Sequence, residues 1–258
     1  MRFDCGTVMP FRCCRERCRA DQFSGFLGEE FMAEYNDMDR KVIKLCKQVV
    51  RMCAEGGSEH ASSSLGLAHI VTGLMYRVMR YDPKNPWHAG SDRLILSEGH
   101  AVPIVYAAYC DIGGVVGELN QASELRFNDA LTLRAADSVL DGRPNPAIGM
   151  PFFDTASGSL GQGLSAAAGL ALGAKLDGID RRFFCICGDG EAREGQVSEA
   201  LDFIIDNNLT AVCTIFNCNG QGQSGCVSPQ QSVEVLAKKV EAFGFEVKII
   251  DGHNWEEI

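Results

Sequence analysis

The stretch FFCICGDGE, residues 183–191, joins an apolar run to a glycine-rich polar turn. The apolar run has the length of a buried strand, and the two glycines around Asp189 let backbone approach a ligand closely. A second stretch of this kind, IFNCNGQ, follows at 215–221, with a helical pattern over 196–207 between the two. Because a strand–helix–strand crossover is right-handed and returns parallel, we expect both strand tips at one edge of a sheet.

The same alternation of strands and helices extends along the rest of the chain. Val42, Leu45, Val49 and Cys53 fall on one face of a 3.6-residue period. The full set of expected helices covers 36–55, 65–80, 101–110, 161–176, 196–207 and 233–243. The expected strands cover 93–97, 182–187, 210–216 and 246–250. Residues 115–148 are rich in turn formers and read as irregular. Apolar strands between helices predict an α/β fold, a three-layer α/β/α sandwich with a mainly parallel sheet.

The first residues differ in pattern from this domain. Residues 1–32 contain five arginines after residue 1, and their apolar positions are interrupted by Gly, Pro and Arg. A secretory signal needs an uninterrupted apolar segment, so none is expected. We interpret residues 1–32 as an extension, either disordered or the product of a start assigned too early, and residues 33–258 as the domain.

Composition excludes several classes of function. The formal net charge of -10 argues against a nucleic-acid partner and gives no attraction to anionic membranes. No apolar run approaches the ~20 residues of a membrane span. The 12 cysteines contain no Cys-x-x-Cys pair, and several, such as Cys46, Cys185, Cys187 and Cys213, lie in apolar runs. Buried free thiols in a reducing, cytoplasmic compartment are the expectation.

The two strand tips also predict a metal site. Asp189 offers a carboxylate and Asn219 an amide oxygen, and a nearby backbone carbonyl would add a third hard ligand. Magnesium or calcium takes such ligands, with diphosphate oxygens and water in the remaining positions. A Gly-Asp-Gly triplet alone would more often be an ordinary turn, so the paired strands and the spaced Asn carry this prediction.

Several ordered motifs resemble one family. Gly188-Asp189-Gly190 through Asn219 looks like the thiamine-diphosphate motif, and GEAREGQV at 190–197 resembles its transketolase version. Further collinear matches are SEGHA at 97–101, TASGSLGQGL at 155–164 and DGH at 251–253. The resemblance to the transketolase diphosphate-binding domain covers about residues 33–258.

This resemblance implies a set of cofactor residues. It implies that Asp189, Asn219 and the carbonyl of Gln221 hold the metal, Mg²⁺ or else Ca²⁺ or Mn²⁺. The residues implied at thiamine diphosphate are His100, Gly158, Leu160, Gly190 and Asn219. Independently, a glycine-rich turn that opens a helix presents backbone amides to anions.

The resemblance also implies a reaction. Transketolases transfer a two-carbon ketol unit between ketose and aldose phosphates, here within the pentose phosphate pathway. The implied catalytic residues are His60, His100, Arg143 and Glu194. His60 would move substrate protons, since histidine titrates near neutrality, although a surface-loop histidine is the alternative. Glu194 would link the two cofactor sites of a dimer, or would be a helix-start glutamate favoured by the helix dipole.

Two positions depart from the family pattern. Arg143 stands where the pattern is Gly-His-Pro; it keeps a donor and could grip a phosphate or sulfonate, but it cannot act as an acid or base near neutrality. Glu98 stands where the family commonly has Lys. Related enzymes, a sulfo-sugar transketolase or deoxyxylulose-phosphate synthase, are therefore alternatives; the segment 194–197 favours transketolase over the synthase.

The sequence supplies only one half of such a site. Thiamine enzymes of this type bind the cofactor between two domains, and no pyrimidine-binding domain is recognised here. We expect sugar-phosphate substrates, a pyrimidine-domain subunit or a missing C-terminal half, and assembly as a homodimer or heterotetramer. Alone, the chain is expected to be inactive; an inactive truncated fragment is the remaining alternative.

Overall fold

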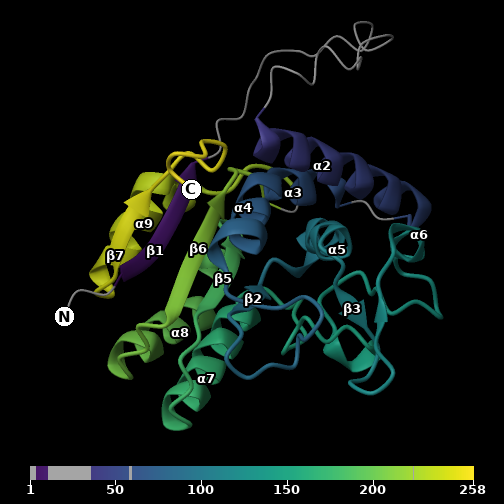
Figure 1. Cartoon of the computed structure of the whole chain (residues 1–258). Coiled ribbons are helices and arrows are strands. Elements are labelled where there is room, and N and C mark those ends of the chain that lie inside the picture. The colour runs from purple at the N-terminus through teal and green to yellow at the C-terminus, as the bar shows by residue number, and fades with distance from the viewer. Residues whose placement is uncertain (1–3, 11–35, 58–59, 223) are drawn as a thin grey trace, which may run out of the picture.

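The main sheet of the protein is parallel and lies between two layers of helices (Figure 1). A computed structural model describes residues 4–10, 36–57, 60–222 and 224–258. Within these residues the sheet has the strand order β2-β5-β6-β1-β7. The strands are β1 (Asp4–Pro10), β2 (Arg93–Leu96), β5 (Phe183–Gly188), β6 (Val212–Cys218) and β7 (Glu246–Ile249).

The helices follow the expected alternation with the strands. They are α2 (Asp37–Glu55), α3 (Ala61–Gly66), α4 (Ala68–Gly73), α5 (Val102–Asp111), α7 (Gln162–Leu176), α8 (Gly195–Asp206) and α9 (Val233–Ala242). Asn36 caps α2, because its side chain accepts a hydrogen bond from the N–H of Asp39 at 2.9 Å. Figure 1 shows α7 beside α8, with α2 to α5 on the other side of the sheet.

Successive residues of β5, an interior strand of the sheet, face different cores. Phe184 and Ile186 pack with buried residues of α2, α4 and α5. Phe183, Cys185 and Cys187 pack with those of α7, α8 and α9. Because side chains alternate across a strand, this division shows that helices cover both faces of the sheet. The three-layer α/β/α prediction is confirmed.

The helix expected over 65–80 is interrupted. The chain turns at Leu67 between α3 and α4, and Leu74–Val78 forms a π-helical turn in which Met79 N–H donates to Leu74 O at 2.8 Å. The apolar period continues through this region, so periodicity alone could not reveal the wider turn.

The N-terminal extension takes a different form where the structure describes it. Residues 4–10 form β1, whose backbone pairs in parallel with β6 and β7. The other residues of 1–32 lie outside the described residues. The stretch 115–148 is largely irregular, as expected, with a small ribbon of β3 (Val115–Val116) and β4 (Ser123–Glu124) and the short helix α6 (Phe127–Ala130).

Among the described cysteines that the sequence singled out, the free-thiol expectation holds except at Cys213, although Cys46 is only half-buried. Cys46, Cys185 and Cys187 carry free thiols. Cys213 is disulfide-bonded, so the expectation of a free thiol is wrong at this residue. Among the described residues, no helix is both long and apolar enough to cross a membrane.

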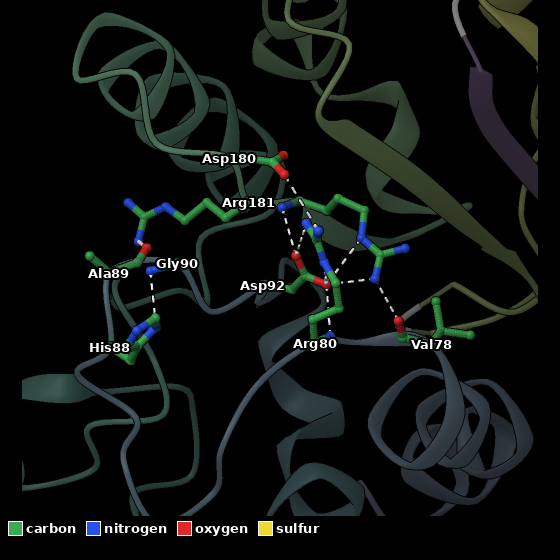
Figure 2. Close-up of polar contacts among 9 residues, drawn as sticks. Val78, Arg80, His88, Ala89, Gly90, Asp92, Asp180 and Arg181 are labelled. Atoms are coloured by element: carbon green, nitrogen blue, oxygen red, sulfur yellow. Dashed lines mark hydrogen bonds and ion pairs between the residues drawn. The ribbon is translucent and has the colours of Figure 1, made fainter.

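An ion-pair network closes the amino end of β2 (Figure 2). Asp92 accepts hydrogen bonds from the backbone N–H groups of Arg80 and Arg182, both at 2.8 Å, and from the Arg182 guanidinium at 2.6 Å. Burial opposes ionisation of Asp92, but the bonds from Arg182 and Arg80 outweigh it and lower its pKa to about 2. This end of the sheet is held together by opposite charges.

Candidate active site

The carboxyl ends of β2, β5 and β6 bring together the residues that the sequence singled out. Strand β5 ends at Gly188 and is followed by Asp189, while β6 ends at Cys218 and is followed by Asn219. Gly188 pairs with Asn217 across the two strands, which places both tips side by side as expected. In a parallel sheet this edge is the usual place for a ligand.

Asp189 is fixed by the backbone of both tips. One carboxylate oxygen accepts from the N–H of Gly190 at 2.6 Å, and the other accepts from the N–H of Gly220 at 2.7 Å. The residue is 2% exposed, and burial raises its pKa above the usual value although these bonds oppose the shift. Within the described ranges no cationic side chain pairs with Asp189, and a buried carboxylate in such surroundings is suited to receive a cation.

The other expected metal ligands lie in the same turn. Asn219 Oδ1 accepts from the N–H of Gln221 at 2.9 Å. The carbonyl oxygen of Gln221 would lie 3.9 Å from a Cβ placed on Gly190. Carboxylate, amide and carbonyl oxygens form a donor set that fits Mg²⁺ or Ca²⁺. Within the described parts of the chain, no group of three His, Cys, Asp or Glu side chains could hold a metal.

A group of small residues lies beside this turn. We call it the cradle; it consists of Gly99, Ser157 and Gly158. Gly158 has φ 144°, which a residue with a side chain rarely adopts. Ser157 anchors the segment to the tip of β2, because its hydroxyl donates to Leu96 O at 2.6 Å. A Cβ on Gly158 would come within 3.2 Å of Arg143 Cγ, and a Cβ on Gly99 within 3.1 Å of Arg143 Cδ. The chain thus uses glycine where the Arg143 side chain passes.

Two histidines lie next to the cradle. The ring centroids of His60 and His100 are 5.1 Å apart. Burial, His60 and Arg143 together lower the pKa of His100 to about 4, so its imidazole is neutral at pH 7. A neutral imidazole can donate one hydrogen bond to an anion and accept another. The two residues before His60 lie outside the described residues.

Glu98 is the least expected group at this edge. It is 2% exposed, and its carboxylate accepts from the Asn217 side-chain amide at 3.0 Å. Burial raises its pKa to about 8; Asn217 opposes this shift, and the charges of Glu191 and Asp189 add to it. The nearest ion-pair candidate is His100, whose Nε2 lies 3.8 Å from Glu98 Oε2.

Glu191 joins three segments of the site, although the sequence analysis assigned it no role of its own. Its carboxylate accepts from the Ser97 hydroxyl, from the N–H of Gly161 and from the N–H of Gly188 at 3.0 Å. These bonds tie the start of α7 and the tip of β2 to the Asp189 turn. Its partner Ser97 lies 94 residues earlier, so no local pattern could have predicted the contact.

Gln231 gives the Asp189 turn a second support. Its side-chain amide donates to Asp189 O at 2.7 Å and to Gly190 O at 3.1 Å. Its own carbonyl accepts from Ser228 N–H at 3.2 Å in a capping box. The turn that carries the expected metal ligands is therefore fixed from both sides.

Leu160 and Glu194 lie at the outer margin of the site. Leu160 is 38% exposed, and its carbonyl accepts from the Gln196 side chain at 2.5 Å. Glu194 is exposed at the N-cap of α8 and makes no side-chain capping bond. Both side chains are open to a ligand or a partner.

A comparison with protein families decides the relationship of this chain. The model described as transketolase, thiamine diphosphate binding domain, matches residues 39–258. The chain belongs to the transketolase family. Its resemblance to the family, inferred above from ordered motifs, is confirmed over most of its length.

Individual transketolases agree with this placement. A transketolase-like protein 2 from Bos taurus is 39% identical over 210 residues, which cover 81% of this chain and 32% of that relative. The transketolase of Homo sapiens is 36% identical over 236 residues, which cover 88% of this chain and 36% of the human protein. The chain thus spans about a third of the length of these relatives.

A shorter relative and a solved structure complete the comparison. A 6-deoxy-6-sulfo-D-fructose transketolase subunit from Clostridium sp. is 34% identical over 222 residues, 86% of this chain and 77% of that subunit. The crystal structure of transketolase from Campylobacter jejuni matches with a TM-score of 0.74 at 28% identity, over 85% of this chain and 34% of that one.

Proposed function

We propose that this chain supplies the diphosphate- and metal-binding half of a transketolase active site, which transfers a two-carbon ketol unit between ketose and aldose phosphates. The observation that carries the proposal is the meeting of Asp189, Asn219 and the Gln221 carbonyl at two adjacent strand tips, beside His100 and Gly158. Such a donor set would suit a divalent ion that accompanies a diphosphate.

When bound, thiamine diphosphate supplies the electron sink that cleavage of a carbon–carbon bond beside a carbonyl requires. The residues of this chain bind and orient that group and handle protons. Asp189 and Asn219 would hold the metal, and the neutral His100 would donate a hydrogen bond to the diphosphate. His60, 5.1 Å from His100 between ring centroids, takes and returns protons of substrate hydroxyls.

We further propose that a pyrimidine-binding domain on another polypeptide or segment completes the site, and that Glu194 faces it. Two observations support this: the chain spans 32% of the bovine relative, and it covers 77% of a relative that is named a subunit. Glu194 is exposed at the start of α8, where an outside partner can reach it.

Sulfonated sugars are the second candidate substrates. The supporting observation is the match to a 6-deoxy-6-sulfo-D-fructose transketolase subunit. Phosphate and sulfonate are both tetrahedral oxyanions, so a donor-rich pocket can hold either. Ketol-transfer rates with fructose 6-phosphate and with 6-deoxy-6-sulfofructose as donors, at equal concentration, separate the two candidates.

The test of the proposed function begins with binding. Calorimetry of the chain with thiamine diphosphate should show binding that requires Mg²⁺. A ketol-transfer assay should then show no turnover by the chain alone and turnover once its pyrimidine-domain partner is added. Turnover by the isolated chain at an ordinary transketolase rate would contradict the two-part site; no Mg²⁺-dependent binding with or without the partner would contradict the function.

The role of His60 has its own test in the reconstituted enzyme. His60→Ala should lower kcat by about 100-fold while the affinity for thiamine diphosphate stays within a few fold, since general acid–base catalysis contributes roughly 10²–10⁴. His88→Ala is the matched control, because His88 is exposed in the loop near Asp92 (Figure 2). An unchanged kcat in His60→Ala would return His60 to the surface-loop interpretation.

A further inference from the structure

The side chain of Arg143 runs along the floor of the cradle rather than away from it. Cβ atoms placed on Gly158 would lie 3.2 Å from Arg143 Cγ, 3.3 Å from Cδ and 3.6 Å from Nε. A Cβ placed on Gly99 would lie 3.1 Å from Arg143 Cδ. Gly158 is an expected diphosphate contact, and Gly99 directly precedes another, His100. The arginine stem therefore passes between the two segments that the diphosphate would touch.

The guanidinium of Arg143 has no acidic partner among the described residues. Nη1 donates to Gly142 O at 2.8 Å, and the residue is only partly exposed. Its charge reaches His100, whose pKa it helps to lower after burial and His60. A partly buried arginine keeps several N–H donors that favour an oxyanion in a two-point geometry.

The other described groups around the cradle are acidic or neutral, so the guanidinium of Arg143 is the positive charge available to a diphosphate there. Glu98, Asp189 and Glu191 are buried at the same edge, and His100 is neutral at pH 7. The resemblance to the family placed a lysine where Glu98 stands, so one positive charge near the diphosphate is absent from that position. Arg143 stands where the family pattern has histidine, and it brings a positive charge back to the same cradle.

We propose that Arg143 is a cofactor-anchoring residue, which binds the diphosphate oxygens of thiamine diphosphate through its guanidinium, and does not bind the substrate. This inference rests on the proposed function, because it assigns a residue to that same site. It gives the two departures from the family pattern one explanation: a positive charge lost at Glu98 is supplied from position 143. Proton transfer near the substrate then falls to His60.

The experiment compares ligands that differ only in phosphate number. Calorimetry on the full chain, with its partner where binding requires it, measures thiamine diphosphate, thiamine monophosphate and thiamine, each with Mg²⁺. Arg143→Gln should weaken thiamine diphosphate binding by about 10- to 100-fold, the range for loss of a charge-assisted hydrogen bond. Thiamine binding should change by less than about two-fold, since it carries no phosphate.

Two further variants control for charge and folding. Lys238→Gln removes the same unit charge from the exposed face of α9 and should leave all three affinities unchanged. Arg143→Lys keeps the charge but loses the two-point geometry, so it should bind thiamine diphosphate several-fold more weakly than the parent and more tightly than Arg143→Gln. If Arg143→Gln unfolds at the assay temperature, the ratio of the thiamine diphosphate affinities of the parent and Arg143→Lys tests the anchoring role.

The outcomes separate this inference from the proposed function. Equal thiamine diphosphate affinity in the parent and the two Arg143 variants overturns the anchoring role. If the Arg143 variants keep the parent's cofactor affinity but have a raised KM for sugar phosphates, the guanidinium binds the substrate, and the anchoring role is again overturned. Failure of the parent itself to bind thiamine diphosphate, alone and with its partner, instead overturns the proposed function.

Discussion

Asp92 and Glu98 flank the same strand, β2, and both are 2% exposed, yet their carboxyl groups meet opposite surroundings. Asp92, at the amino end, accepts from two arginines, and its pKa falls to about 2. Glu98, at the carboxyl end, accepts from a neutral amide, and its pKa rises to about 8. The negative charge of Asp92 is balanced by arginines at the amino end of β2, whereas burial at the carboxyl end keeps Glu98 protonated up to about pH 8.

This difference distinguishes a buried carboxylate that stabilises the fold from one that is available to a ligand. A buried charge that is paired and hydrogen-bonded holds segments together, whereas one without a positive partner lowers stability until a ligand arrives. Asp189 follows the pattern of Glu98, since burial raises its pKa as well. The carboxyl edge therefore carries a cost in the ligand-free protein that a divalent cation would offset.

The largest expected effect is loss of the cation site. Asp189→Ala should abolish Mg²⁺-dependent binding of thiamine diphosphate, because it removes the carboxylate from the proposed metal ligands. Asp189→Asn keeps the shape and serves where the alanine variant folds poorly. Asp202→Ala, on the exposed face of α8, is the control. Calorimetry that gives the same magnesium-dependent affinity for Asp189→Ala and the parent would refute the assignment.

The structural carboxylate should show its effect in stability instead. Asp92→Asn should lower the free energy of unfolding at pH 7 by about 2–3 kcal/mol, at the low end for a broken buried pair because the Arg80 and Arg182 side chains are 53% and 39% exposed. The pKa of Asp92 is lowered, so its contribution is present above pH ~4 and is lost as pH falls through about 2. Urea denaturation measures the change.

Asp180→Asn provides the matched control for that experiment. Asp180 also pairs with Arg80, at 3.5 Å, but its side chain is 92% exposed. An exposed pair contributes little, so we expect a change below about 0.5 kcal/mol. Equal decreases in the free energy of unfolding in Asp92→Asn and Asp180→Asn would show that the buried ion pairs stabilise the protein no more than the exposed one.

The smallest expected effect is a gain, and it depends on pH. The pKa of Glu98 is raised to about 8, so the stability that its protonated form gives is full below pH ~4.5 and is lost as pH rises through about 8. Glu98→Gln stays neutral, and it should therefore be more stable than the parent at pH 9 by on the order of 2 kcal/mol.

The same comparison at pH 5 should show almost no difference between Glu98→Gln and the parent. Thermal or urea unfolding at both pH values measures this, with Glu246→Gln on the exposed residue of β7 as control. A Glu98→Gln variant that is less stable than the parent at pH 9 would mean that the carboxylate is ionised and satisfied. The contrast between the two ends of β2 would then fail.

The sequence by itself predicted the layers and the meeting of the two strand tips that carry the candidate site. The apolar run at 183–187 and the helical periods in the flanking segments depend on neighbours within one or two turns, so they can be read locally. The Gly-Asp-Gly turn and Asn219 follow adjacent strands, and the right-handed crossover rule puts their tips together. The motif order was specific enough to identify the family, which the match over 39–258 confirms.

Only the tertiary structure decided which distant groups share a charge or a hydrogen bond. Asp92 pairs with arginines 12 and 90 residues away, and Glu191 accepts from Ser97, 94 residues away. The arginine stem on the Gly158 cradle is likewise a contact between separate loops. Local patterns state what a segment forms, but the dielectric surroundings and partners of a buried carboxyl arise only when several segments pack around it. That is why the sequence could locate the site while the opposite behaviour of Asp92 and Glu98 required the fold.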